Sequence, residues 1–323
     1  MKAVVYTRYG SPDVLDLREV QKPTPLPGQV LMKVHATGVN AGDWHLLRGK
    51  PFPMRLMGFG LLRPKHHILG TDVAGVVEAV GESVMSFKPG DEVFGDLSAS
   101  GFGGYAEYVC AREDALALKP QNLSFEEAAA VPTSAFTALQ ALRDKGKVQP
   151  GQEVLINGAS GGIGSYAVQI AKALGARVTG VCSTKNLDMV RALGADEVID
   201  YTKVDFTMSE KRYDVIHAAN GYHPLAHYKR ALKPSGIYVM SGGSSRQLSD
   251  VMFLGPFMSM FGGKKMCNLM MKPRQSDLHY IAELIESGQV KPVIETCYPL
   301  AQVAEAIRRT EEGHNSGKLV IRI

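Results

Sequence analysis

The chain has 323 residues, of which 45% are hydrophobic and 21% are charged, and its formal net charge is +4. This length exceeds the size at which one hydrophobic core usually stops growing, so two domains are expected in an ordinary globular protein. The basic residues are spread along the chain in short runs such as Arg63-Pro-Lys65, so nucleic acid is not an expected partner. The four cysteines form no C-x-x-C pair, which argues against a disulfide framework and against a cysteine-rich zinc lobe.

The chain shows no sign of a targeting or membrane segment. The first residues resemble a strand and lack the apolar run of a signal peptide. The most apolar stretch, residues 251–261, is too short to span a bilayer and contains Gly255 and Pro256. A cytoplasmic location without a membrane span is therefore expected.

Residues 1–119 predict a barrel-like β domain, because short alternating segments are separated by turns rich in glycine and proline. Residues 51–67 have no clear period and predict a long loop. The predicted strands are 14–20, 30–37, 71–80, 92–95 and 106–110.

From Ser124 onward, strands alternate with helices, a pattern typical of a parallel sheet with right-handed crossovers. Residues 242–260 have no interpretable period, and residues 294–323 return to strand–helix–strand. The predicted helices are 126–130, 134–142, 165–174, 187–193, 225–232 and 277–287. The predicted strands are 154–157, 177–182, 197–199, 214–218, 236–241 and 265–271.

One stretch, residues 153–164, organises the second half of the chain. A buried strand runs into a glycine-dense turn, and the turn opens directly into a helix. The spacing Ala159-x-Gly161-x-x-Gly164 matches the dinucleotide fingerprint, in which backbone amides at a helix start hold a pyrophosphate. The interpretation is a nucleotide site made by Ala159, Ser160, Gly161, Gly162, Ile163 and Gly164; a purely structural turn is the alternative.

The residues after the turn favour NADPH over NADH. NAD-binding sheets carry an acidic residue about 20 residues past the glycines, where it binds the ribose hydroxyls. Here no carboxylate occurs between Gly161 and Asp188, and Ser183 and Lys185 stand where a 2′-phosphate would lie. A solvated lysine at a helix start is the alternative interpretation of Lys185.

Many segments together resemble the medium-chain dehydrogenase/reductase superfamily, in its zinc-independent, quinone oxidoreductase-like branch. They run nearly from end to end of the chain: Val39-Asn40-Ala-Gly-Asp43, Ile68-Leu-Gly-Thr-Asp-Val-Ala-Gly75, Pro89-Gly-Asp-Glu-Val-Phe94, Gly104-Tyr-Ala-Glu-Tyr108, residues 129–138 and 157–164, Leu193-Gly-Ala-Asp-Glu-Val-Ile-Asp-Tyr201 and Gly317-Lys318. The resemblance implies a Rossmann doubly wound parallel sheet plus a GroES-like β-barrel catalytic domain. The catalytic domain would comprise residues 1–119 and 272–323, and the nucleotide-binding domain residues 120–271.

The resemblance also assigns candidate site residues. It implies that Asn40 lies near the nicotinamide, with Asp43 behind it as a catalytic residue or, alternatively, a helix cap. The other positions that it places at the cofactor are Thr133, Tyr201, Asn220, Ser241, Gly242 and Lys318. An ordinary turn at Asn220 and a solvated lysine at Lys318 are the alternatives. It further implies a homodimer formed through the strand at 265–271, with the substrate in the cleft between the domains.

Zinc-dependent members would carry a cysteine near Asn40 and a His-Glu pair at Thr71-Asp72, and both features are missing. The nine histidines suggest no metal-ligand set, since His66 and His67 are adjacent. Without a metal to polarise an alcohol or carbonyl oxygen, a quinone or the β-carbon of an enone is the better hydride acceptor. The expected activity is NADPH-dependent reduction of a hydrophobic quinone or α,β-unsaturated carbonyl.

Two other functions remain open at this stage. One is a zinc-type, NADP-dependent alcohol or aldehyde dehydrogenase. The other is a non-catalytic NADPH-binding protein, such as a crystallin-like relative that binds RNA. The apolar stretches 52–62 and 251–261 could line an acceptor pocket or form an interface. No sequence motif identifies the substrate.

Overall fold

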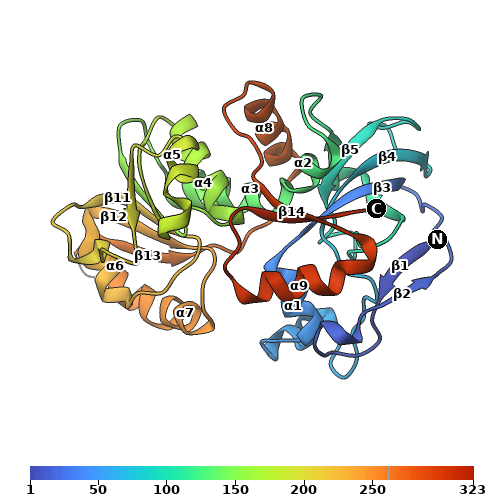
Figure 1. The fold of residues 1–323 in the computed structure, drawn as a ribbon, viewed down its shortest axis with the longest axis horizontal. Coiled ribbons are helices and arrows are strands. Elements are labelled where there is room, and N and C mark those ends of the chain that lie inside the picture. Colours follow the sequence, from blue (N-terminus) through green and yellow to red (C-terminus); the bar gives the residue numbers. More distant parts are fainter. Residues whose placement is uncertain (261) are drawn as a thin grey trace. The chain divides into compact units, whose positions relative to one another are not determined.

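The computed structural model describes residues 1–260 and 262–323, so Phe261, the last residue of the predicted apolar stretch 251–261, lies outside the described residues. The chain divides into two compact units (Figure 1). The first unit comprises residues 1–133, 273–286 and 292–323, and the second comprises residues 134–272 and 287–291.

The first unit is built on a long central strand, β3 (Gln29–Val39), which pairs with three other strands. The larger sheet has the order β14-β15-β3-β4-β5-β7, with β6 paired to β3, and β1 and β2 form a separate antiparallel pair. Alternate residues of β3, Val30, Met32 and Val34, are buried in one apolar cluster, as the two-residue period of a strand requires. The remaining strands of this unit are β1 (Lys2–Val5), β2 (Asp16–Glu19), β4 (Asp72–Val80), β5 (Glu92–Asp96), β6 (Tyr108–Arg112), β7 (Leu116–Leu118), β14 (Ile294–Pro299) and β15 (Lys318–Arg322).

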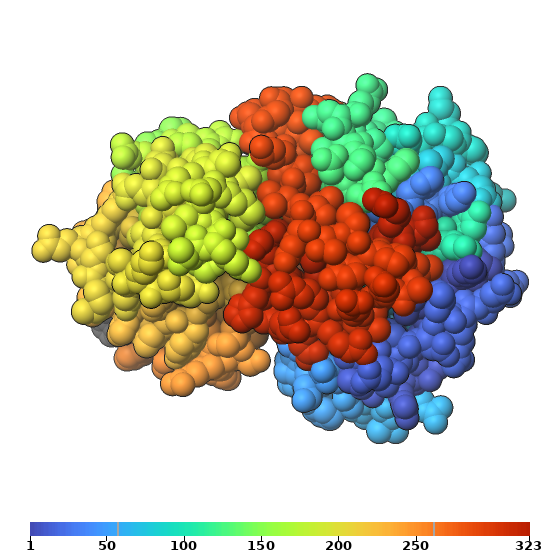
Figure 2. Space-filling model, in the orientation of Figure 1, coloured from blue at the N-terminus to red at the C-terminus, as the bar shows by residue number. Residues whose placement is uncertain are grey.

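The helices of the first unit are α1 (Ala41–Arg48), α2 (Phe125–Ala129), α8 (Gln275–Glu286) and α9 (Val303–Glu312). Helix α9 presents Val303, Ala306 and Ile307 at helical spacing to the same apolar cluster that holds Leu46 and Leu47 of α1. The C-terminal segment therefore packs against the N-terminal part of the chain, and Figure 2 shows the two segments in contact at the surface. This packing places Lys318, at the start of β15, beside the end of β3.

The second unit holds a six-stranded parallel sheet of order β10-β9-β8-β11-β12-β13. Counted from β8, this is the 3-2-1-4-5-6 order of the Rossmann fold. The helices α4 and α5 lie on one face of the sheet and α6 and α7 on the other (Figure 1). The strands are β8 (Glu153–Asn157), β9 (Arg177–Cys182), β10 (Glu197–Asp200), β11 (Tyr213–Ala218), β12 (Leu232–Met240) and β13 (Lys265–Asn268); the helices are α3 (Pro132–Leu139, which begins in the first unit), α4 (Gly162–Ala173), α5 (Leu187–Ala192), α6 (Leu225–Ala231) and α7 (Ser245–Ser259).

Three segments differ from the expectation. Residues 120–133 fall in the first unit because α2 packs against β3 and β4, whereas the sequence assigned them to the nucleotide-binding domain. The predicted loop at 51–67 contains a π-helical turn, Arg55–Phe59. Most of residues 242–260 form α7, capped by the Ser244 hydroxyl, which accepts a hydrogen bond from the Gln247 amide.

Helix α7 has no clear hydrophobic period because its large apolar side chains are exposed. Met252, Phe253, Leu254 and Phe257 are between 50% and 78% exposed, while Val251 and Gly255 are buried. Residues 251–259 of the apolar stretch are therefore helical and not a loop, and their role as a pocket wall or an interface stays a prediction.

Candidate active site and cofactor site

The junction between β3 and α1 builds the first part of the candidate site. Asn40 follows the last residue of β3 in an extended conformation and precedes the first turn of α1. The Asn40 backbone amide donates to the Asp43 carboxylate at 2.8 Å, the half of a capping box that fixes the chain entering a helix. Asn40 is therefore held in place by the helix that begins directly after it.

Lys318 connects Asn40 to Asp72 in the interior of the first unit. Its ammonium donates to the Asn40 side-chain oxygen at 2.5 Å and to the Val39 carbonyl at 3.2 Å, and it lies 3.4 Å from the Asp72 carboxylate. The Asn40 side-chain nitrogen donates to the same carboxylate at 2.9 Å. Since Lys318 is 3% exposed and Asp72 is fully buried, this is a buried ion pair with an amide fixed between its partners.

Thr133 extends this network to a second buried carboxyl group, that of Asp96. The Thr133 hydroxyl lies 2.6 Å from an Asp72 oxygen and 2.9 Å from an Asp96 oxygen, and the Thr133 amide donates to Asp72 at 2.9 Å. One hydroxyl carries one proton, so it can donate to only one of the two carboxyl groups. Burial and the neighbouring Asp72 charge raise the pKa of Asp96, and Thr133, Asp72 and Asp96 form one buried hydrogen-bonded network.

Asp43 is a second buried carboxyl with an altered titration. Besides the Asn40 amide, it accepts from the Tyr105 hydroxyl at 2.9 Å and from the Gly70 amide at 3.3 Å. Burial raises the pKa of Asp43 to about 6, although these hydrogen bonds oppose the shift. The contacts of Asp43 are those of a helix cap that orients Asn40, the alternative role that the sequence left open.

The glycine turn of the second unit joins β8 to α4, as predicted. The amides of Gly158 and Ala159 donate to the Val181 carbonyl, and the first helical bond runs from Ser165 to Gly161. The amides of Gly162, Ile163 and Gly164 precede that bond and point from a helix N-terminus, where the backbone dipole favours an anion. These three amides can hold a phosphate.

Gly164 has a steric reason to be glycine. A Cβ atom there would lie 2.0 Å from the Gly158 carbonyl oxygen, so no other residue lets α4 pack this closely on the turn. Gly158 adopts φ +83°, which also favours glycine, and a Cβ there would crowd Asn220 at 2.8 Å. The turn therefore has the close helix–strand packing of a dinucleotide-binding fingerprint.

The candidate 2′-phosphate residues lie at the carboxyl ends of β9 and β10. Ser183 follows β9, Lys185 is exposed in the next turn, and Tyr201 follows β10 and is 55% exposed. Asp200 is the last residue of β10, and its carboxylate accepts hydrogen bonds from the Thr184 hydroxyl at 2.5 Å and from the Thr202 hydroxyl at 2.7 Å. Asp200 was not predicted as a site residue, because the carboxylate that binds the ribose is expected at the end of the second strand, β9.

Asn220, Ser241 and Gly242 also lie at the carboxyl edge of this sheet. Asn220 follows β11, and its amide donates to the Asn157 carbonyl at 3.1 Å. The Ser241 hydroxyl lies 2.7 Å from Nε2 of His217, a fully buried histidine whose pKa is lowered to about 4 by burial. The neutral His217 was not predicted, since a single histidine inside an apolar strand carries no signal of its own.

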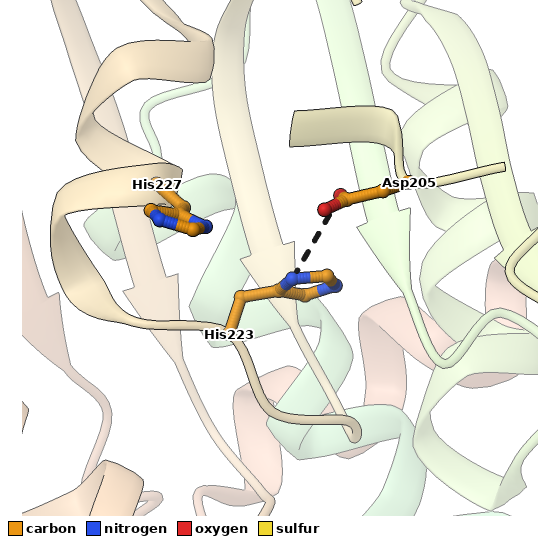
Figure 3. Close-up of side chains that lie close together, drawn as sticks. All are labelled: Asp205, His223 and His227. Atoms are coloured by element: carbon orange, nitrogen blue, oxygen red, sulfur yellow. Dashed lines mark ion pairs between the residues drawn. The ribbon is translucent and has the colours of Figure 1, made fainter. Parts of the chain in front are cut away.

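Two histidines and an aspartate converge in the second unit, a group that the sequence did not suggest as a ligand set. Asp205, His223 and His227 each offer a ligand atom, and these atoms lie within 4.8 Å of one another (Figure 3). His223 and His227 are four residues apart, a spacing that places two side chains on the same face of a helix. Pro224 between them interrupts the helical pattern, so the spacing did not stand out in the sequence.

The side chains of the first unit's buried network do not fit a catalytic zinc ion. Catalytic zinc sites use thiolates or imidazoles besides carboxylates, and the network described here contains neither: it consists of Asn40, Asp43, Asp72, Asp96, Thr133 and Lys318, with Thr71 beside it. Asp72 already binds the ammonium of Lys318, and a second cation there would be repelled.

Among the described residues, none of the helices combines the length and the apolar composition that crossing a bilayer requires.

Comparisons with known proteins agree with the fold and identify the family. The family described as "Alcohol dehydrogenase GroES-like domain" matches residues 26–121, and that described as "Zinc-binding dehydrogenase" matches residues 193–321. The chain is 35% identical to the chloroplast envelope quinone oxidoreductase homolog of Arabidopsis thaliana, with 99% of this chain and 98% of the relative covered.

Two solved structures superimpose on nearly the whole chain. The quinone oxidoreductase of Coxiella burnetii has a TM-score of 0.87 at 30% identity, covering 100% of this chain and 99% of the other. A structure described as an NAD-dependent alcohol dehydrogenase has a TM-score of 0.86 at 32% identity, covering 100% of both chains. This chain belongs to the medium-chain dehydrogenase/reductase superfamily, an NAD(P)-binding oxidoreductase family, in its quinone oxidoreductase-like branch.

Proposed function

We propose that this protein is an NADPH-dependent oxidoreductase that transfers hydride to a quinone or to the β-carbon of an α,β-unsaturated carbonyl, without a metal ion at the catalytic centre. The observation that carries the proposal is the buried network of Lys318, Asn40 and Asp72. It places an amide and an ammonium where zinc-dependent relatives need metal ligands, and its carboxylate is already paired with that ammonium. Chemistry at this centre therefore depends on positioning and hydrogen bonding.

Asn40 is proposed as the residue that acts at the nicotinamide. Lys318 and Asp72 fix both ends of its side-chain amide, so the amide keeps one orientation at low entropic cost. Asp43 is proposed to position Asn40 through its backbone amide, and Thr133 to act beside it. When bound, NADPH supplies the hydride.

The proton required by the reaction is proposed to come through Thr133. Hydride addition to the β-carbon moves the double-bond electrons onto the carbonyl oxygen, and the resulting enolate, like the oxyanion of a reduced quinone, must take up a proton. The Thr133 hydroxyl is partly exposed and carries a proton beside the Asp72 and Asp96 carboxyl groups. Transfer of that proton to the product, with its replacement from water, would complete the reduction.

The glycine turn at 159–164 is proposed to hold the cofactor's phosphates, and Ser183, Lys185 and Tyr201 its 2′-phosphate. Support comes from the three amides at the start of α4 and from the absence of a carboxylate at the end of β9. Asn220, Ser241 and Gly242 are proposed to border the ribose units, since ligands of doubly wound sheets bind at the carboxyl ends of the strands.

A substrate panel tests the proposal. Oxidation of NADPH and of NADH is followed with a naphthoquinone, a medium-chain enal and a saturated aldehyde, and reduction of NADP⁺ is followed with primary alcohols. The proposal expects turnover of the quinone or the enal. Efficient alcohol oxidation would indicate an alcohol dehydrogenase, and tight NADPH binding without any turnover would indicate a non-catalytic binding protein.

We also propose a homodimer and a cytoplasmic location. β13 (Lys265–Asn268) ends the sheet of the second unit, and an edge strand offers unpaired backbone groups to a second copy. Analytical ultracentrifugation tests the dimer, and a proline substituted for Cys267 within β13 should shift the protein toward monomer.

A further inference from the structure

We propose that the second unit contains a binding site for a divalent transition metal such as Zn²⁺, formed by Asp205, His223 and His227. The proposal does not rest on the proposed function, because the site shares no residue with the network around Lys318 or with the glycine turn. It assigns a ligand to the one group of metal-binding side chains that converges among the described residues.

The three side chains come from two elements that meet at the carboxyl edge of the sheet. Asp205 precedes the short 3-10 turn Phe206–Met208, which follows β10, and His223 and His227 come from the segment before α6 and from its first turn. Figure 3 shows the Asp205 carboxylate and the two imidazole rings around a common space. Nδ1 of His223 lies 3.8 Å from an Asp205 oxygen.

The separations are close to those of a bound metal. Zinc bonds to nitrogen and oxygen are about 2.0–2.2 Å, which places tetrahedral ligand atoms roughly 3.4 Å apart. The present ligand atoms lie within 4.8 Å of one another, so changes of roughly 1 Å through side-chain rotation bring them to coordination distance. Histidine nitrogens with one carboxylate suit Zn²⁺, Co²⁺ and Ni²⁺ better than Mg²⁺ or Ca²⁺.

The surroundings hold the ligands in place. The Asp205 oxygen that faces His223 also accepts from the amide and the hydroxyl of Thr207, at 2.9 and 2.8 Å. Arg230 of α6 donates twice to the Thr207 carbonyl and so joins the helix to the turn that carries Asp205. Such outer hydrogen bonds orient metal ligands and strengthen binding.

The imidazoles are suited to ligation. Nδ1 of His227 is buried and has no hydrogen-bond partner among the described residues, which is costly unless a ligand or water satisfies it. One carboxylate offsets part of the charge of the ion, although the Arg230 guanidinium nearby weakens binding.

Three protein ligands leave at least one coordination position for water or an exchangeable ligand. A bound ion would join the loop after β10 to the start of α6, both at the edge of the sheet that carries the glycine turn. We therefore expect the metal to stabilise the second unit against unfolding.

Isothermal titration of the chelator-treated, dialysed full-length protein with Zn²⁺, together with the visible absorption of bound Co²⁺, tests the site. Asp205→Asn and His227→Gln are compared with His279→Gln, which removes an exposed histidine from α8. Thermal melting of each metal-free variant verifies folding, and Asp205→Asn provides a conservative variant at an exposed position if His227→Gln does not fold.

The proposal expects one equivalent of metal, an affinity at least about tenfold weaker in Asp205→Asn and His227→Gln, and an unchanged affinity in His279→Gln. It also expects Zn²⁺ to raise the melting temperature of the wild type and of His279→Gln only. Absence of saturable binding, or binding that survives both ligand substitutions, would overturn it.

Discussion

Replacing Lys318 with methionine tests whether the buried network of the first unit depends on its ammonium group. Methionine keeps most of the length of the lysine stem and removes the charge that lies 3.4 Å from Asp72. At that distance, with an effective dielectric constant of about 20, the attraction is roughly 5 kcal/mol. Loss of one partner from a buried ion pair typically costs about 3–5 kcal/mol, so we expect Lys318→Met to lower the free energy of unfolding by that amount.

The assay is urea unfolding followed by tryptophan fluorescence. Trp44 is the single tryptophan of the chain and lies in α1, so the signal reports on the first unit. Lys22→Met is the matched control, because Lys22 and Glu78 form a surface pair whose side chains are 38% and 41% exposed, and its loss should change the stability far less than Lys318→Met.

A double variant separates the buried charge from the loss of packing. Adding Asp72→Asn to Lys318→Met removes the carboxylate that would otherwise stay buried without its cation, so the double variant should be less destabilised than the sum of the two single variants. Equal losses in Lys318→Met and Lys22→Met, or strict additivity in the double variant, would refute the account of a coupled buried pair.

Three further predictions concern other parts of the molecule. Burial raises the pKa of Asp43 to about 6, above its unfolded value of about 3.9, so its stabilising contribution is complete below about pH 4 and about 3 kcal/mol is lost as the pH rises through 6. Asp43→Asn should abolish that part of the pH dependence of urea unfolding, and an unchanged slope between about pH 4 and 7 would contradict the shift. Gly164→Ala should weaken NADPH binding in fluorescence titrations at least about tenfold, because its Cβ would meet a carbonyl oxygen at 2.0 Å. Gly42→Ala, whose Cβ meets nothing within 4 Å, should bind NADPH normally. Similar affinities of the two variants would count against the glycine turn as the phosphate site. Lys185→Ala should raise KM for NADPH roughly tenfold and leave KM for NADH unchanged, with the exposed Lys88→Ala as control, and an equal rise for both cofactors would remove Lys185 from the 2′-phosphate site.

The nucleotide-binding edge was predictable because its signals are local. A buried strand, a glycine turn and a helix follow one another within 21 residues, from Glu153 to Ala173, and the structure confirms this succession in β8 and α4. Gly164 lies too close to a carbonyl oxygen for a Cβ atom, and Gly158 has a positive φ. Because both constraints favour glycine, the glycines themselves mark the turn in a single sequence.

The buried network of the first unit could be predicted only in part. Asn40 and Lys318 were identified through the resemblance, but their contact joins β3 to β15 across 278 positions of the chain. Asp72 and Asp96 face each other because β4 and β5 pair in one particular register, which short sequence patterns do not encode. The contact of the Thr133 hydroxyl with both carboxyl groups follows from that register.

Helix α7 and the histidine cluster escaped prediction for different reasons. The apolar side chains of α7 are exposed, so its sequence lacks the hydrophobic stripe that marks most surface helices. His223 and His227 are close in sequence, but Asp205 comes from another element and completes the group only in the fold.

The most direct test of the account is the steady-state reduction of a naphthoquinone by chelator-treated protein carrying Asp205→Asn and His227→Gln, with NADPH and NADH compared. The double substitution removes the proposed metal site of the second unit, so any remaining metal requirement must come from the catalytic centre. We predict that activity is retained and that kcat/KM is higher with NADPH than with NADH. Activity that is lost on chelation and restored by Zn²⁺, or equal kcat/KM for the two cofactors, would contradict the proposal of a metal-free NADPH-dependent reductase.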